Sequence, residues 1–145
     1  MKGMSLRERM SMHWHAYRWT GTGAERGNED ERRPASPGFR ASPLPPMRTG
    51  DWLAKPASRV AATFDDARQA TEWMAGEYAK VGEALLLPEA VPIEERLRIA
   101  LDLLTRGVDV QWGEWLQGGR FITIGVICCP NRQVRHPCPI RRPHA

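Results

Sequence analysis

The chain has 145 residues, a formal net charge of +4 and a hydrophobic content of 41%, with 13 Gly and 12 Pro. Because Gly and Pro gather toward the two ends, the part that can pack a core is about 80 residues, which is marginal for stability. No apolar run reaches the roughly eighteen residues of a membrane-spanning helix, so we expect no membrane span.

Short patterns, or their absence, disfavour three further classes. The segment Met1–Arg9 is charged where a secretory signal would be apolar. Three cysteines are an odd number for a disulfide framework. We therefore expect a cytoplasmic protein with free thiols. The sequence has no phosphate loop, nucleophile elbow or dinucleotide fingerprint, so we expect no enzymatic activity and no cofactor.

The distribution of charge is more informative than its total. Residues 1–59 carry 11 basic and 6 acidic side chains, residues 60–118 carry 5 and 11, and residues 119–145 carry 5 and none. Two basic arms therefore flank an acidic middle. Such arms are typical of proteins that bind polyanions, although solvated tails show the same pattern.

Residues 1–50 are expected to be mostly disordered, since their basic, Pro-rich composition cannot bury enough apolar surface to offset the entropy of ordering. Near their start lie His13 and His15, separated by Trp14. On a strand the two histidines would share a face. No third metal ligand follows nearby in the sequence, so we interpret this stretch as a peripheral amphipathic segment.

A weak strand candidate and two helices come next along the chain. The strand candidate is Ser58–Phe64. Asp65 then provides an N-cap for a helix whose apolar residues share one face and which ends near Gly82. A second amphipathic helix begins at Pro92 and ends before Gly107.

A β-hairpin is predicted after the second helix. Apolar residues alternate from Val108 to Trp112, and Gly118-Gly119 precedes the apolar run Phe121–Ile127. Both glycines can adopt the positive φ angles of a tight turn. Residues 51–129 are therefore predicted to form a small α+β domain, with two helices packed on a small antiparallel sheet that ends in the hairpin. An all-helical bundle is the alternative if no hairpin forms.

The end of the chain contains candidate zinc ligands, namely Cys128, Cys129, His136 and Cys138. Thiolate and imidazole are the ligands that structural zinc prefers. However, adjacent cysteines on a strand point to opposite faces, which disfavours a site made of these four residues. Residues 130–145 form a basic, Pro-rich tail that we expect to be loose. We therefore expect no bound metal, with one thiol packed inward and the others on the tail.

Nucleic acid is the other partner that the composition suggests. Five arginines are candidate phosphate ligands, namely Arg120, Arg132, Arg135, Arg141 and Arg142. The sequence has no helix rich in Arg, Asn or Gln that would read bases, so only non-specific binding to the nucleic-acid backbone is implied.

The short chain, the Pro/Ser-rich start, the small hairpin domain and the tail Arg135–Arg142 together resemble small accessory proteins of actinobacterial mobile elements. That group includes plasmid transfer, or conjugation, and spread proteins. The resemblance is one of size and composition, and it implies a plasmid accessory role without assigning any site residue.

Three functions follow from the sequence, in order of preference. The first is a non-enzymatic interaction protein that binds an unidentified protein partner or a second copy of itself, in the service of a plasmid or other mobile element. The alternative is a nucleic-acid-associated protein that uses its arginine-rich arms. The third is a small zinc-binding protein.

Overall fold

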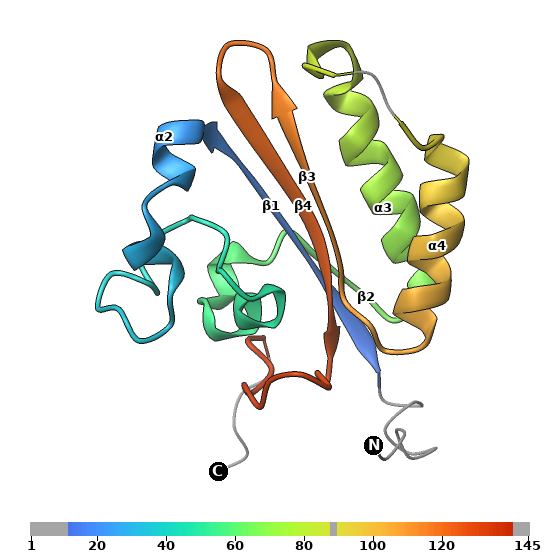
Figure 1. Ribbon diagram of the computed structural model, residues 1–145. Helices are drawn as coiled ribbons and strands as arrows, with labels where there is room; N and C mark the ends of the chain where they lie inside the picture. The colour runs from blue at the N-terminus through green and yellow to red at the C-terminus, as the bar shows by residue number, and fades with distance from the viewer. Residues whose placement is uncertain (1–11, 88–89, 141–145) are drawn as a thin grey trace.

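Residues 12–87 and 90–140 are described by a computed structural model, in which they form a four-stranded antiparallel sheet of order β2-β1-β4-β3 (Figure 1). The strands are β1 (His13–Thr22), β2 (Ala62–Phe64), β3 (Val110–Leu116) and β4 (Arg120–Cys129). Helices α3 (Ala67–Lys80) and α4 (Ile93–Thr105) lie together on one face of the sheet. The predicted α+β class, with two helices on a small antiparallel sheet, is confirmed.

The remaining elements are short. They are α2 (Gly23–Arg26) and the 3₁₀ turns η1 (Glu29–Arg32), η2 (Thr49–Ala54), η3 (Ala57–Arg59) and η4 (Gly82–Ala84). All but η4 belong to the irregular segment between β1 and β2, which lies on the sheet face opposite the helices. Within the described residues, no helix combines the length and the apolar character that crossing a membrane requires.

Local sequence signals explain where the main elements begin and turn. The side chain of Asp66, rather than that of the expected Asp65, caps α3 by accepting a hydrogen bond from the Arg68 amide at 2.7 Å. The β3–β4 turn is made by Gly118 and Gly119, with φ angles of 80° and 72°. Such angles are accessible to glycine at little cost, so this turn confirms the predicted hairpin.

Strand β4 is buried on both faces, which explains its unbroken apolar run. Ile122, Ile124 and Val126 pack under the helices, whereas Phe121 and Ile127 pack against the irregular segment on the other face. A strand covered on both sides loses the alternation of apolar and polar residues that marks a half-exposed strand. The centre of the sheet is therefore the centre of the core.

Residues 12–50 differ from the expectation of disorder, whereas residues 1–11, to which the same expectation applied, lie outside the described residues. Strand β1 pairs with β4 along its whole length and lies in the middle of the sheet. The segment after it is held by buried cations: the Lys55 ammonium donates to the carbonyls of Phe39 and Ser42 at 2.7 and 2.8 Å, and Arg32 Nε donates to Pro45 O at 2.7 Å. These hydrogen bonds satisfy backbone carbonyl groups of the segment, and composition alone does not predict such partners.

The described part of the C-terminal tail, residues 130–140, also differs from the expected loose conformation. The Asn131 amide donates to both carboxylate oxygens of Asp109, at 2.9 and 3.0 Å. Further along, His136 Nε2 lies 2.9 Å from Asp51 Oδ1, and Asp51 is itself buried. The folded unit therefore extends beyond the expected boundaries at residues 51 and 129 on both sides.

Candidate metal centre

The site lies at the end of the sheet where β1 begins and β4 ends. His13 and His15 are directed to the face opposite the helices, because alternate residues of a strand share a face. Trp14, between them, faces the helices and donates its indole hydrogen to Leu104 O at 3.1 Å. Both imidazoles are buried, with exposures of 5% and 0%, and their rings meet edge to face with centroids 4.7 Å apart.

The orientation of His15 is set by the neighbouring strand β2. Its Nδ1 lies 2.9 Å from the hydroxyl oxygen of Thr63, its cross-strand partner. A proton on Nδ1 that is donated to this oxygen leaves the lone pair on Nε2. Histidines that bind metals commonly have their second nitrogen held in this way.

Cys129 is placed by the pairing of β1 with β4. It is the direct partner of His13 across the two strands, so the thiol and the imidazole share a face. Cys128 is the partner of Trp14 and therefore faces the helices. Burial raises the pKa of the Cys128 thiol, and the nearby Asp109 carboxylate raises it further. The side chains of the two adjacent cysteines therefore lie on opposite faces of the sheet.

Cys138 reaches the same site from the C-terminal segment. Its sulfur lies 3.4 Å from Nε2 of His13 and 3.4 Å from Nε2 of His15. The side chain is half-buried, whereas the other three are buried. The part of this segment that precedes Cys138 is held by the hydrogen bonds of Asn131 to Asp109, described above, and by the contact of His136 with Asp51.

The four side chains, called here the His/Cys centre, are His13, His15, Cys129 and Cys138, and their ligand atoms lie within 4.8 Å of one another. Bond lengths of about 2.0–2.1 Å to nitrogen and about 2.3 Å to sulfur place ligand atoms of a tetrahedral zinc site roughly 3.4–3.8 Å apart. The two distances of 3.4 Å from Cys138 Sγ to the imidazole nitrogens agree with that geometry, and the remaining pairs lie within 4.8 Å. Comparison with known protein families, curated proteins and solved structures finds no match.

Charge also fits a divalent cation at the His/Cys centre. Two thiolates and two neutral imidazoles around Zn²⁺ give a neutral cluster, which lowers the cost of burying the ion.

Tyr17 lies two residues beyond His15 on the same face of β1. It is fully buried, and its hydroxyl has no hydrogen-bond partner among the described residues. Burial raises the pKa of Tyr17, and Cys129 and Cys138 raise it further. A thiolate created by metal binding would offer this part of the core a hydrogen-bond acceptor.

The structure brings together two of the four zinc candidates named from the sequence. Cys129 and Cys138 belong to the His/Cys centre, whereas Cys128 faces the helices and His136 contacts Asp51. The two histidines of the centre come from the other end of the chain. The signal for them was the alternation that places His13 and His15 on one face, but the pairing of β1 with β4 is what supplies the thiols.

The three candidate phosphate ligands that the structure describes do not all lie on one surface. Arg120 lies at the opposite end of β4 from Cys129, about 30 Å away for a strand of this length. Arg132 donates to Arg106 O at 3.0 Å, and Arg135 is exposed nearby on the same segment. Arg141 and Arg142 lie outside the described residues.

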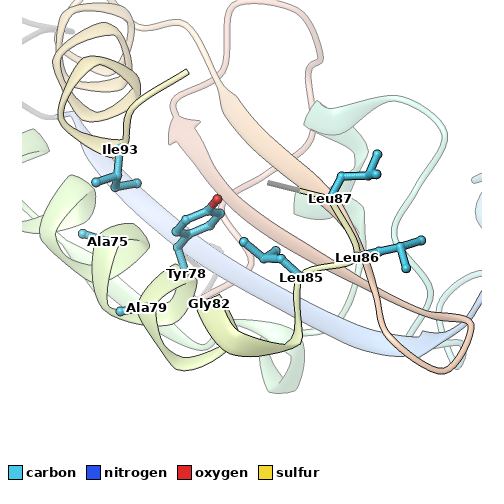
Figure 2. Close-up of a pocket in the computed structure, with 8 residues that line it drawn as sticks. All are labelled: Ala75, Tyr78, Ala79, Gly82, Leu85, Leu86, Leu87 and Ile93. Atoms are coloured by element: carbon cyan, nitrogen blue, oxygen red, sulfur yellow. The ribbon is translucent and has the colours of Figure 1, made fainter. Parts of the chain in front are cut away.

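A second concave site lies beside α3 and carries no reactive groups that suggest chemistry (Figure 2). It is an open groove of about 550 Å³ lined by Ala75, Tyr78 and Ala79 of α3, by residues 82 and 85–87, and by Ile93 of α4. Figure 2 shows Leu85 directed toward Tyr78. The lining is mainly apolar and offers no cluster of reactive groups, so the His/Cys centre is the stronger candidate for function.

Proposed function

We propose that this protein is a small zinc-binding protein whose His/Cys centre joins the C-terminal segment to the sheet. The observation that carries the proposal is the convergence of two imidazole nitrogens and two thiol sulfurs within 4.8 Å, from three separate parts of the chain. Two nitrogen and two sulfur ligands in a tetrahedral arrangement favour zinc over the oxygen-preferring cations.

A structural role fits better than a catalytic one. Catalytic zinc sites keep one coordination position open for water or substrate, whereas structural sites are closed by four protein ligands. The His/Cys centre offers four ligands, and three of them are buried. The groove beside α3 is lined by the helices and the segment between them, on the other side of the sheet from the centre.

The expected effect of the ion is on stability. Each ligand must be ordered before the ion can bind, so the free energy of metal binding adds to the free energy of folding. His13 and Cys138 are 125 residues apart in sequence, so the ion would connect the beginning and the end of the folded unit. A domain of this size gains much from such a link.

The test is the metal content of matched variants. The protein purified without chelator should contain about one equivalent of zinc, and removal by a chelator should lower its thermal midpoint. Cys129→Ala should abolish stoichiometric binding, whereas Cys128→Ala should retain it, because the neighbouring thiol faces the helices. The histidines provide a second matched pair, in which His15→Ala should lose the metal and His136→Ala should keep it.

The result that would contradict the proposal is equally specific. If zinc-depleted protein takes up no zinc and melts at the same temperature with and without it, the His/Cys centre is not a zinc site. Equal loss of metal in Cys128→Ala and Cys129→Ala would also contradict it. Since both variants remove one buried thiol, a general loss of packing affects both, and only coordination separates them.

The other two functions expected from the sequence are also proposals. An accessory role for a plasmid or other mobile element rests on size and composition, and so does non-specific binding of nucleic acid by the arginine-rich arms. A closed zinc centre is compatible with either role, because structural zinc commonly orders small modules that bind partners.

A further inference from the structure

We propose that Cys129 and Cys138 are a redox-sensitive thiol pair, which a hydroperoxide converts into a disulfide with release of the bound ion. The inference rests on the proposed zinc centre and adds a modification site to it. All ligand atoms of the His/Cys centre lie within 4.8 Å of one another, and the two sulfurs are among them. A disulfide bond is about 2.05 Å long, so the sulfurs need to approach by at most about 2.8 Å.

The two thiols differ in burial and in their position in the fold, and this difference determines the order in which they react. Cys138 is half-buried and belongs to a segment with no helix or strand, so this residue is more accessible to an oxidant than the buried Cys129, and the backbone around it can adjust. Cys129 is only 4% exposed and ends the central strand β4. Cys138 is therefore the thiol that reacts first with the oxidant, and Cys129 is the thiol that then attacks the oxidised sulfur.

The fold also determines which thiols can pair. Cys128 is adjacent to Cys129 in sequence, but it is fully buried on the helix face, where its sulfur lies 4.0 Å from Leu104 O. A bond from Cys138 to Cys128 would have to cross the sheet. Of the three cysteines, only Cys129 and Cys138 share a face, so the structure assigns a single disulfide.

The reaction balances without any further reactant. The Cys138 thiolate attacks the hydroperoxide, its sulfur takes one oxygen as sulfenic acid, and the O–O bond breaks to leave an alkoxide or hydroxide that takes a proton from water. The Cys129 thiolate then attacks the Cys138 sulfur and expels hydroxide, which takes a proton from the solvent to become water. The two sulfurs lose two electrons in total and the peroxide gains them. Zinc is left with two imidazole ligands and dissociates.

The experiment treats zinc-loaded, full-length protein with hydrogen peroxide and follows zinc release with a chromogenic chelator. We expect one zinc released per chain, an intact mass lower than that of the reduced, zinc-free chain by two hydrogens, and a cross-linked peptide joining residues 129 and 138. A dithiol reductant should restore both thiols and zinc binding. The Cys128→Ala variant should release zinc and form the same cross-link. Because this variant has no thiol at position 128, the cross-linked peptide must contain the thiol of Cys129.

Three outcomes would overturn the inference. These are retention of zinc under peroxide that fully oxidises a free thiol, release of zinc with oxygen added to the thiols and no cross-link, and a cross-link that contains Cys128. Failure of the proposed function looks different, since the protein would then bind no zinc at all. In that case the disulfide would be tested by treating the reduced, zinc-free chain with hydrogen peroxide and recording the same peptide map. Absence of the 129–138 cross-link would then overturn the inference independently of zinc.

Discussion

At the scale of single residues, one peptide bond separates two different roles. Cys128 and Cys129 are adjacent at the end of β4, and the pleat of the strand directs them to opposite faces. Cys128 behaves as a small apolar side chain in the helix-facing core, whereas Cys129 meets two histidines and another thiol. Residue type alone does not distinguish them, and only the face of the strand does.

Lys55 is a second residue whose surroundings give it an unusual property. Its side chain is buried at 1% exposure, its ammonium donates to two backbone carbonyls, and it lies 4.0 Å from the centroid of the Phe39 ring. Burial, together with the nearby charge of Arg59, lowers the pKa of Lys55 from its ordinary value of 10.5 to about 8. A neutral amine still has two hydrogens for the two carbonyls, so deprotonation leaves these bonds intact.

The lowered pKa predicts a specific pH dependence of stability. Between pH 8 and pH 10 the unfolded chain keeps the Lys55 proton while the folded protein loses it, so raising the pH should stabilise the folded state at this residue. The expected gain is about 2 kcal/mol relative to Lys55→Met, which cannot titrate. Urea unfolding of both proteins at the two pH values measures it. A difference between the proteins that does not change with pH would contradict the prediction.

At the scale of elements, the two main helices depend on one buried stripe each. In α4, Leu104 is completely buried and its carbonyl oxygen accepts the hydrogen bond from Trp14. Ile99, on the same helix, is 43% exposed. The helix is therefore held by one face, which is typical of an amphipathic helix packed on a sheet.

This difference between the faces of α4 predicts the cost of two equivalent truncations. Leu104→Ala should lower the free energy of unfolding by about 2–5 kcal/mol, because it removes buried contacts and leaves a cavity. Ile99→Ala should lower it by less than about 1 kcal/mol, because the side chain already contacts water. Chemical denaturation of both variants measures the two values. Similar losses would mean that the exposed face of α4 is also covered.

At the scale of the whole molecule, the two ends of the folded unit meet at one end of the two central strands. Strand β1 begins where β4 ends (Figure 1). The C-terminal segment then places Cys138 beside His13. The hydrogen bonds of Asn131 and the contact of His136 with Asp51 hold this segment, and zinc would add a third attachment.

Loss of that attachment predicts local rather than global loosening. After chelation, tryptic cleavage at Arg132 and Arg135 should become at least about tenfold faster, because the C-terminal segment then opens more often. Cleavage at Arg98, in α4 on the other side of the sheet, serves as the control and should change little. Limited proteolysis followed by mass spectrometry measures both rates. Unchanged cleavage at Arg132 and Arg135 would show that zinc does not hold the segment.

The elements that the sequence by itself determined are those with local causes. Three features depend only on neighbours a few residues away and could therefore be predicted from the sequence. They are the apolar stripe of α4, the first-turn acids Glu94 and Glu95, and the turn at Gly118-Gly119. Together they were sufficient for the α+β class. The alternation rules also indicated that His13 and His15 would share a face, and that Cys128 and Cys129 would not.

What only the tertiary structure decided depends on contacts between distant parts of the chain. Composition indicated disorder before residue 50, but pairing with β4 places β1 at the centre of the sheet, and the hydrogen bonds of Lys55 hold the segment that follows. The His/Cys centre has the same origin, since His13 and Cys138 are 125 residues apart. The local sequence pattern predicts on which face of a strand a side chain lies. The residues that it meets on that face depend on strand register and on the path of the whole chain, which a short stretch of sequence does not determine.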